Sequence, residues 1–150
     1  MREIALAELR NLIGQEIAVS DWAHISQERI NLFAQATGDH QWIHVDVERC
    51  RKESPFGGTI AHGFLTLSLL PMLVQGAITI SGVRIGVNYG LNKVRFPAPV
   101  LAGSRVRGRI VLLAVEDIEG GAQMTWWVTM EREGNDKPVC VAESISRHYL

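Results

Sequence analysis

The sequence contains few cysteines and no excess of charge of either sign. Cys50 and Cys140 are the only cysteines among 150 residues, and no CxxC pair or cysteine–histidine zinc spacing is present. A disulfide framework is therefore not expected. We expect two free thiols in a reducing compartment. The 15 basic and 16 acidic residues give a net charge of −1. This balance gives no reason to expect nucleic acid or an anionic membrane as a partner.

Long apolar runs are also absent. The longest helical apolar stretch, 64–74, is shorter than the roughly 20 residues that a membrane-spanning helix needs. The first ten residues, MREIALAELR, lack the apolar core and cleavage site of a secretion signal. We therefore expect a cytoplasmic protein without membrane contact. The length and the apolar fraction of 47% predict a single domain, 1–150, with a substantial core.

Charge is missing altogether from one internal segment. From Thr59 to Ile80 there is no Asp, Glu, Lys or Arg. The leucines and other apolar side chains of this segment surround a helix axis rather than forming one stripe, which predicts a helix buried on all sides. Pro71 lies inside the segment and is expected to kink or shorten that helix.

The region before this segment is expected to be helical with loops. Ser26 is a suitable N-cap for a helix through Ala36, and Gly38 is a suitable stop. Residues 39–44 are therefore expected in a loop, 45–52 in a short charged helix, and 54–58 in a second loop.

The region after the segment is expected to be strands. Stretches 83–89 and 91–96, separated by Gly90, have strand character, and arginines alternate with apolar residues over 105–110. Glycine-rich turns separate two further strands, 124–131 and 139–148. A sheet wrapped around a central helix buries both elements, and this is the arrangement of the hot-dog fold, of the α+β class.

Three blocks resemble the MaoC-like (R)-specific enoyl-CoA hydratase family, in its nodulation-protein-N-like branch. The block ATGDHQWIHVD at 36–46 places four residues between Asp39 and His44, as the family does. The block IAHGFLT at 60–66 contains a His-Gly pair, and NYGLNKVRFPAPV at 88–100 matches the family's strand with its Phe-x-x-Pro-Val ending. The resemblance runs from about residue 19 to the C-terminus.

The resemblance implies reversible hydration of trans-2-enoyl-CoA to (3R)-3-hydroxyacyl-CoA. Asp39 and His44 would hold the attacking water and transfer its proton. Gly63 would donate its backbone N–H to the thioester oxygen. CoA is part of the substrate, so no separate cofactor is expected. The residues expected near the substrate are Gln41, Trp42, His62, Phe64, Asn88, Tyr89, Lys93 and Arg95; Lys93 and Arg95, with Arg105 and Arg107, are candidates for binding CoA phosphates.

Two departures from the family pattern affect the expected substrate range. Gln41-Trp42 stands where most members have Asn-Pro, which adds bulk near the site. Pro71 stands where some relatives have a serine close to the catalytic histidine. His62 is expected mainly to support the loop geometry.

Other functions remain open on the sequence. A hot-dog thioesterase or carrier-protein dehydratase would carry an acid on the central helix, and 59–80 has none. A non-catalytic acyl-thioester-binding or assembly module would not need Asp39 and His44. A metal site at His40 and His44 with Asp39 and Asp46 is disfavoured, because no HExxH motif is present and these residues are expected in a loop. The resemblance also implies a homodimer, with 83–89 as a candidate pairing edge.

Overall fold

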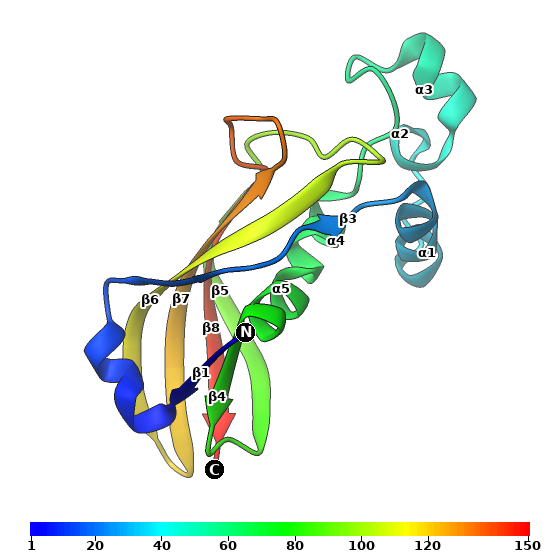
Figure 1. Cartoon of the computed structure of the whole chain (residues 1–150). Coiled ribbons are helices and arrows are strands. Elements are labelled where there is room, and N and C mark those ends of the chain that lie inside the picture. Colours follow the sequence, from blue (N-terminus) through cyan, green and yellow to red (C-terminus); the bar gives the residue numbers. More distant parts are fainter.

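The computed structural model describes residues 1 to 150 and shows a long antiparallel sheet with helices on one side and at one end (Figure 1). In chain order the elements are β1 (Arg2–Ala5), the 3-10 helix η1 (Leu6–Leu12), β2 (Glu16–Val19), β3 (Ala23–His24), α1 (Gln27–Thr37), α2 (Trp42–Val45), α3 (Val47–Glu53), α4 (Gly63–Ser68), α5 (Leu70–Ala77), β4 (Ile78–Ser81), β5 (Ile85–Arg95), β6 (Arg105–Ile118), β7 (Gly121–Arg132) and β8 (Cys140–Tyr149).

The main sheet has the strand order β2-β6-β7-β8-β5, with β3 pairing the end of β6. All of its pairs are antiparallel, whereas β1 and β4 form a separate parallel pair. Side chains of β6 and β7 alternate between buried and half-buried, which is the period-2 pattern of a sheet with one covered face. The sheet curves around α4 and α5 (Figure 1), and 24 buried apolar side chains form one cluster between them. The expected sheet around a central helix is confirmed.

The central helix is bent rather than straight. Its two parts, α4 and α5, meet at Leu69, two residues before Pro71. Hydrogen bonds still run through the junction, from Leu69 N–H to Leu65 O and from Leu73 N–H to Leu69 O. Proline has no N–H, and a residue in the first turn of α5 needs no N–H for the hydrogen bonds of that helix. Pro71 therefore bends the helix without ending it. Leu73 packs on β6 beside Gly108, where an added Cβ would lie at an ordinary 3.7 Å from the leucine side chain.

The prediction that the central helix is buried on all sides is wrong for the isolated chain. Phe64 is 69% exposed and Met72 is 43% exposed, although Leu65 and Leu73 are buried. One side of α4 and α5 packs on the sheet, while the other has no covering element. The apolar side chains do surround the helix axis, but the sheet covers only one side of it.

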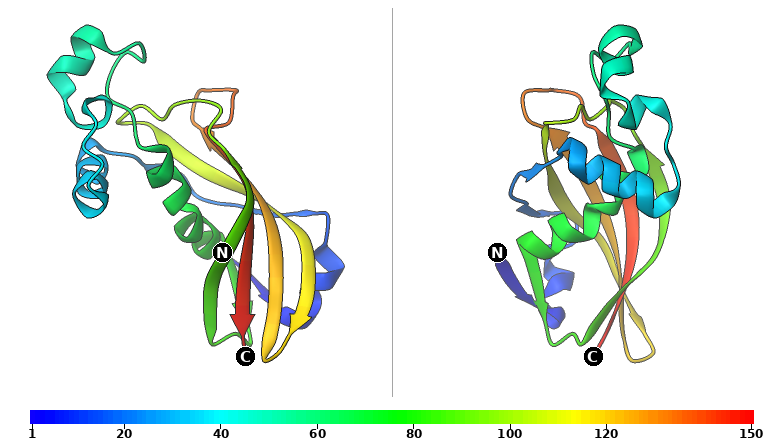
Figure 2. Two further views of the ribbon diagram at one scale, coloured as in Figure 1. Left: turned by 180° about the vertical axis from the view of Figure 1, so that it is seen from behind. Right: turned by 90° about the vertical axis from the view of Figure 1, so that its right-hand side faces the viewer.

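Helices α1, α2 and α3 form an arm beyond one end of the sheet (Figure 2). The predicted cap and stop of α1 are confirmed, since Ser26 accepts from Arg29 N–H and Gly38 has a φ of 80°. The expected loop 39–44 is wrong in its second half, because Trp42–Val45 forms the one-turn helix α2. The Asp46 side chain then caps α3, which begins and ends slightly later in the chain than the expected range 45–52. None of the helices has the length and apolarity that crossing a bilayer requires.

Strand β5 is continuous through Gly90, where two separate strands were expected. Register shifts between Asn88 and Gly90 and between Leu91 and Lys93 accommodate the irregularity within one ladder against β8. Such bulges keep a strand paired while adding a residue, so a glycine need not end it. β5 forms one edge of the main sheet and is exposed along nearly its whole length.

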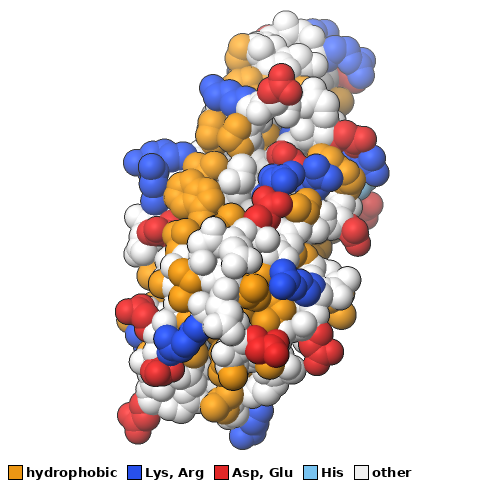
Figure 3. Space-filling model, turned by 60° about the vertical axis from the view of Figure 1, so that its left-hand side comes forward, with side chains coloured by type: hydrophobic (Ala, Val, Ile, Leu, Met, Phe, Trp, Pro, Cys, Tyr) orange, Lys and Arg blue, Asp and Glu red, His pale blue; other side chains and the backbone are white.

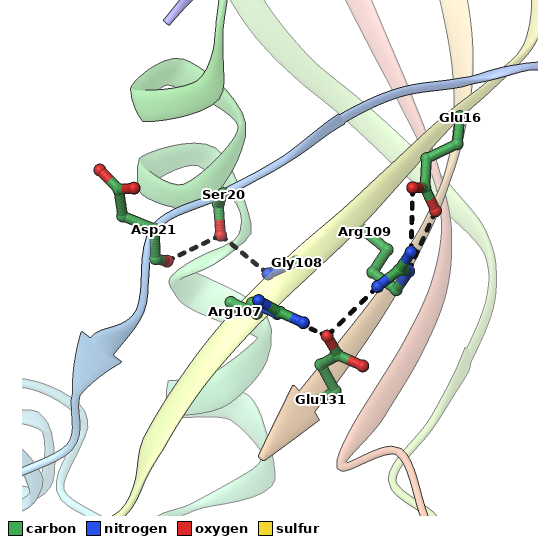
Figure 4. Close-up of polar contacts among 7 residues, drawn as sticks. All are labelled: Glu16, Ser20, Asp21, Arg107, Gly108, Arg109 and Glu131. Carbon is green, nitrogen blue, oxygen red and sulfur yellow. Dashed lines mark hydrogen bonds and ion pairs between the residues drawn. The ribbon is translucent and has the colours of Figure 1, made fainter. Parts of the chain in front are cut away.

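The arginines of β6 form ion pairs across the outer face of the sheet (Figure 4). Arg109 makes a two-pronged pair with Glu16, Arg107 pairs with Glu131, and Arg105 pairs with Glu133. Figure 3 shows cationic and anionic side chains interspersed over one face of the molecule. Arg105 and Arg107 thus have carboxylate partners within the chain, and their candidacy for CoA phosphates stays a prediction.

Candidate active site

Three ionisable side chains from separate segments meet between the arm and the central helix. Asp39 follows α1, His44 lies on α2, and His62 immediately precedes α4. Their ligand-type atoms all lie within 4.8 Å of one another. A backbone hydrogen bond of 3.0 Å from Ile60 N–H to Ile43 O ties the segments together. The structure thus brings Asp39 and His44 together with His62, as the spacing indicated.

His44 has a defined tautomer. Its Nδ1 lies 2.7 Å from the carbonyl oxygen of Ile60. A carbonyl can only accept, so Nδ1 carries the proton and Nε2 presents a lone pair. The ring is only 6% exposed, and this burial lowers the pKa of His44 below its ordinary value of 6.5. Gln27 Nε2 donates to the His44 carbonyl at 2.8 Å and holds α2 in place. A neutral imidazole with a free Nε2 can accept a proton.

His62 contacts both other members of the cluster. Its ring stacks on His44 with centroids 3.9 Å apart and planes 26° apart. Its Nε2 donates to the backbone oxygen of Asp39 at 2.9 Å, and Phe33 covers another side of the ring. His62 is 3% exposed, and its Nδ1 has no partner in the chain. These contacts hold Asp39 and His44 at a fixed separation.

A pair of substitutions separates the two contacts of His62. We expect His62→Phe, which keeps a stacking ring but leaves the Asp39 carbonyl unpaired, to lower kcat about tenfold with little change in KM. We expect His62→Gln, which can keep the donor, to retain more activity. Steady-state kinetics of both variants with an enoyl-CoA check this, and equal loss in both variants contradicts the hydrogen-bonding role.

The cluster is poorly arranged for a metal ion. The lone pair of an imidazole nitrogen lies in the ring plane. The stacked rings of His44 and His62 have nearly parallel planes, so their lone pairs do not converge on one point. His40, the other candidate ligand, is exposed and lies outside the group.

Gly63 follows His62 and is the first residue of α4. No residue accepts a hydrogen bond from its N–H; the first N–H groups of this helix with partners are those of Leu65 and Thr66, which bond the His62 carbonyl. The ring of Phe96 lies against Gly63, and a Cβ atom there would fall 3.0 to 3.2 Å from three ring carbons. Glycine is therefore required for the close approach of Phe96, and its N–H is free to bind a ligand oxygen.

Three of the residues expected near the substrate lie around the cluster: Gln41 and Trp42 at α2, and Phe64 on α4. The Gln41 N–H is 3.3 Å from the Asp39 carboxylate. The Trp42 ring is half-buried and stacks under the Arg49 guanidinium at 4.0 Å. Phe64 is exposed and makes an edge contact with Phe96 at 6.2 Å. The bulk of Trp42 is thus directed toward α3.

The residues expected on β5 divide into two groups. Lys93 and Arg95 are exposed at the end of β5 that leads into Phe96, and so toward Gly63. Asn88 and Tyr89 lie farther along the strand, and both line a large cavity. The Tyr89 ring is also covered by the Arg147 guanidinium at 3.5 Å.

That cavity, of about 690 Å³, lies between the central helix and strands β5 and β8. It begins at Leu67, one helical turn beyond Gly63, and does not reach Asp39, His44 or His62. Its lining includes polar and aromatic residues of β7 and β8 that were not anticipated from sequence, namely Trp126, Ser144, Ser146 and His148. Alternation of polar residues at 144, 146 and 148 was the available signal, but the face on which they lie was not known.

The conserved-domain model described as "MaoC like domain" matches residues 8–133. The chain belongs to the MaoC-like dehydratase family. It is 57% identical over 145 residues to 3-hydroxyacyl-thioester dehydratase Z of Mycobacterium tuberculosis, covering 96% of this chain and 95% of the relative. It is 50% identical over 149 residues to nodulation protein N of Rhizobium leguminosarum bv. viciae, covering 97% and 92%. The predicted family and its enzymatic class are confirmed.

A solved structure of the family has the same fold. The unliganded R-hydratase PhaJ1 of Pseudomonas aeruginosa superposes with a TM-score of 0.69 at 22% identity, covering 91% of this chain and 81% of that one. At this identity the likeness concerns the fold alone. The hot-dog prediction is confirmed for this MaoC-like protein.

Proposed function

We propose that this MaoC-like protein hydrates trans-2-enoyl-CoA to (3R)-3-hydroxyacyl-CoA and catalyses the reverse dehydration. The observation that carries the proposal is the pairing of a neutral His44 with the Asp39 carboxylate beside the free N–H of Gly63. The 57% identity to dehydratase Z supports it. The buried, unpaired thiols of Cys50 and Cys140 suit the reducing cytoplasm, where we propose that it acts.

In this proposal Asp39 and His44 hold one water between them. His44 Nε2 receives a proton as the water oxygen bonds to C3 of the enoyl thioester, and the electron pair of the double bond moves toward the thioester oxygen. The imidazolium then returns the proton to C2, and the thioester carbonyl re-forms. Asp39 accepts a hydrogen bond from the water and stabilises the transient imidazolium. Because one water serves both carbons, both additions occur on one face.

The negative charge that develops on the thioester oxygen needs a donor. The Gly63 N–H would supply it, since no group of the chain competes for that N–H. Lys93 and Arg95, beyond Phe96, would meet the CoA phosphates. The acyl chain would extend from Gly63 along α4 into the cavity between the helix, β5 and β8.

Crotonyl-CoA distinguishes this proposal from the thioesterase alternative. We expect loss of enone absorbance without release of the CoA thiol. Thiol release without loss of the enone would support a thioesterase, although α4 and α5 carry no acid for that chemistry. Absence of both signals would favour a non-catalytic acyl-binding module.

The pH dependence follows from the state of His44. Because the neutral imidazole is the active form, activity is lost when His44 is protonated. Burial lowers its pKa, so we expect the acidic limb of kcat/KM to have its midpoint below pH 6.5. A pH–rate profile with crotonyl-CoA measures this, and a midpoint clearly above 6.5 contradicts the proposed role.

We also propose a homodimer formed through β5. This strand pairs only with β8, and its exposed apolar side chains include Ile85, Val87 and Leu91. A free edge with such residues favours pairing with another strand. A second copy added at β5 would extend the sheet and cover the open side of the central helix.

Light scattering tests the dimer. We expect a mass of twice 16.6 kDa for the wild type. Val87→Lys should shift the protein toward the single-chain mass, whereas Val19→Lys, at an exposed apolar position of β2, should not. A wild type of single-chain mass would contradict the proposal.

A further inference from the structure

The cavity between the central helix and the sheet contains an ordered row of polar groups. Ser144, Ser146 and His148 alternate along β8 and therefore share one face, at spacings of about 7 Å. All three line the cavity. Asn88 lines it from β5, in register with Ser146. A cavity for a plain alkyl chain has no need of such a row.

Part of the row forms a chain of hydrogen bonds. Trp126 Nε1 donates to Ser146 Oγ at 2.9 Å, and Ser146 Oγ lies 2.9 Å from His148 Nε2. A serine hydroxyl can both donate and accept, so the bond between Ser146 and His148 forms with either tautomer of the ring. Ser146 and His148 Nε2 therefore already have partners within the chain.

Other members of the row have no partner within the chain. Ser144 is 8% exposed, yet its hydroxyl makes no hydrogen bond with any other residue, and it lines the cavity. Asn88, exposed on β5, makes no side-chain hydrogen bond within the chain and lines the cavity beside it. Burying an unpaired hydroxyl against a purely apolar ligand would cost free energy, because the hydroxyl would lose its water without replacement. These groups are suited to a ligand that carries a polar atom.

We infer that this cavity takes acyl chains bearing a neutral oxygen, a hydroxyl or a carbonyl, well beyond the thioester. The inference rests on the proposed function for the position of the thioester at Gly63. The oxygen would bond Ser144 or Asn88.

A neutral oxygen fits the cavity better than a carboxylate. Ser144 and Asn88 are neutral, and burial lowers the pKa of the neighbouring His148 and favours its neutral form. The one cation of the lining, Arg84, is exposed to water. A carboxylate placed inside would therefore lose its hydration without gaining an ion pair.

Binding of saturated acyl-CoA tests the inference without requiring turnover. Calorimetry would compare dodecanoyl-CoA with isomers that carry one hydroxyl at successive carbons of the distal half of the chain. We expect at least one isomer to bind about fivefold to tenfold more tightly than the unsubstituted ester, the gain of one neutral hydrogen bond. Ser144→Ala or Asn88→Leu should remove that preference.

Thr125→Val is the matched control. Thr125 is next to Trp126 on β7 and lies outside the cavity lining, so its loss of a hydroxyl should leave the preference intact. The inference is overturned if no isomer binds more tightly than dodecanoyl-CoA, or if the preference survives both cavity variants. Saturated esters cannot be hydrated, so failure here is separate from failure of crotonyl-CoA turnover, which would count against the proposed function alone.

Discussion

His44→Gln is expected to lower kcat for crotonyl-CoA hydration by about a thousandfold, or about 4 kcal/mol of barrier. Glutamine at this position can still donate a hydrogen bond to the Ile60 carbonyl but cannot accept and return a proton. Asp39→Asn should cause a loss of similar order, because the amide cannot stabilise an imidazolium as a carboxylate does. Initial rates of enone loss at saturating substrate measure both effects.

Two positions outside the cluster provide matched controls. His40→Gln makes the same chemical change at an exposed histidine outside the cluster, and Asp136→Asn does so in the distant turn before β8. Both should retain nearly full activity, and circular dichroism should show all four variants folded. Full turnover by folded Asp39→Asn would contradict the assignment of Asp39.

Gly63→Pro is expected to lower kcat a further hundredfold or more below Gly63→Ala. Both changes add a Cβ against the Phe96 ring, but only proline removes the N–H. Proline is tolerated at the first position of a helix, and the extended backbone of His62 suits a following proline. The difference between the variants therefore measures the replacement of the N–H by the proline ring.

Gly63→Ala is itself informative about Phe96. The added Cβ would lie 3.0 Å from the ring, so alanine should reduce activity moderately, and Phe96→Leu should restore part of it by freeing space. Equal activity of Gly63→Ala and Gly63→Pro would mean that the N–H does not stabilise the developing charge.

Local chemistry made some elements predictable from the sequence. Ser26 and Gly38 fix the ends of α1 through a side-chain acceptor and a left-handed backbone, which depend on those residues alone. The spacing of Asp39, His44 and the His-Gly pair indicated the cluster, and the structure brings its members together. The helix α2 was missed because a single turn is too short to show a periodicity.

Features that depend on distant contacts could not be predicted. The stacking of His62 on His44 joins residues 18 positions apart and has no local pattern. The pairing of Arg107 with Glu131 depends on the register of β6 with β7. The alternation of polar residues at 144, 146 and 148 is visible in the sequence. The face of β8 that meets the helix, however, is set by the packing of the whole sheet.

The stereochemistry of the product tests the central claim most directly. Wild-type protein incubated with crotonyl-CoA should consume the enone, and chiral chromatography of the released acid should show (3R)-3-hydroxybutyrate almost exclusively. Formation of the (3S) acid, a racemic mixture, or no hydroxy acid from folded protein would contradict the account of Asp39, His44 and Gly63.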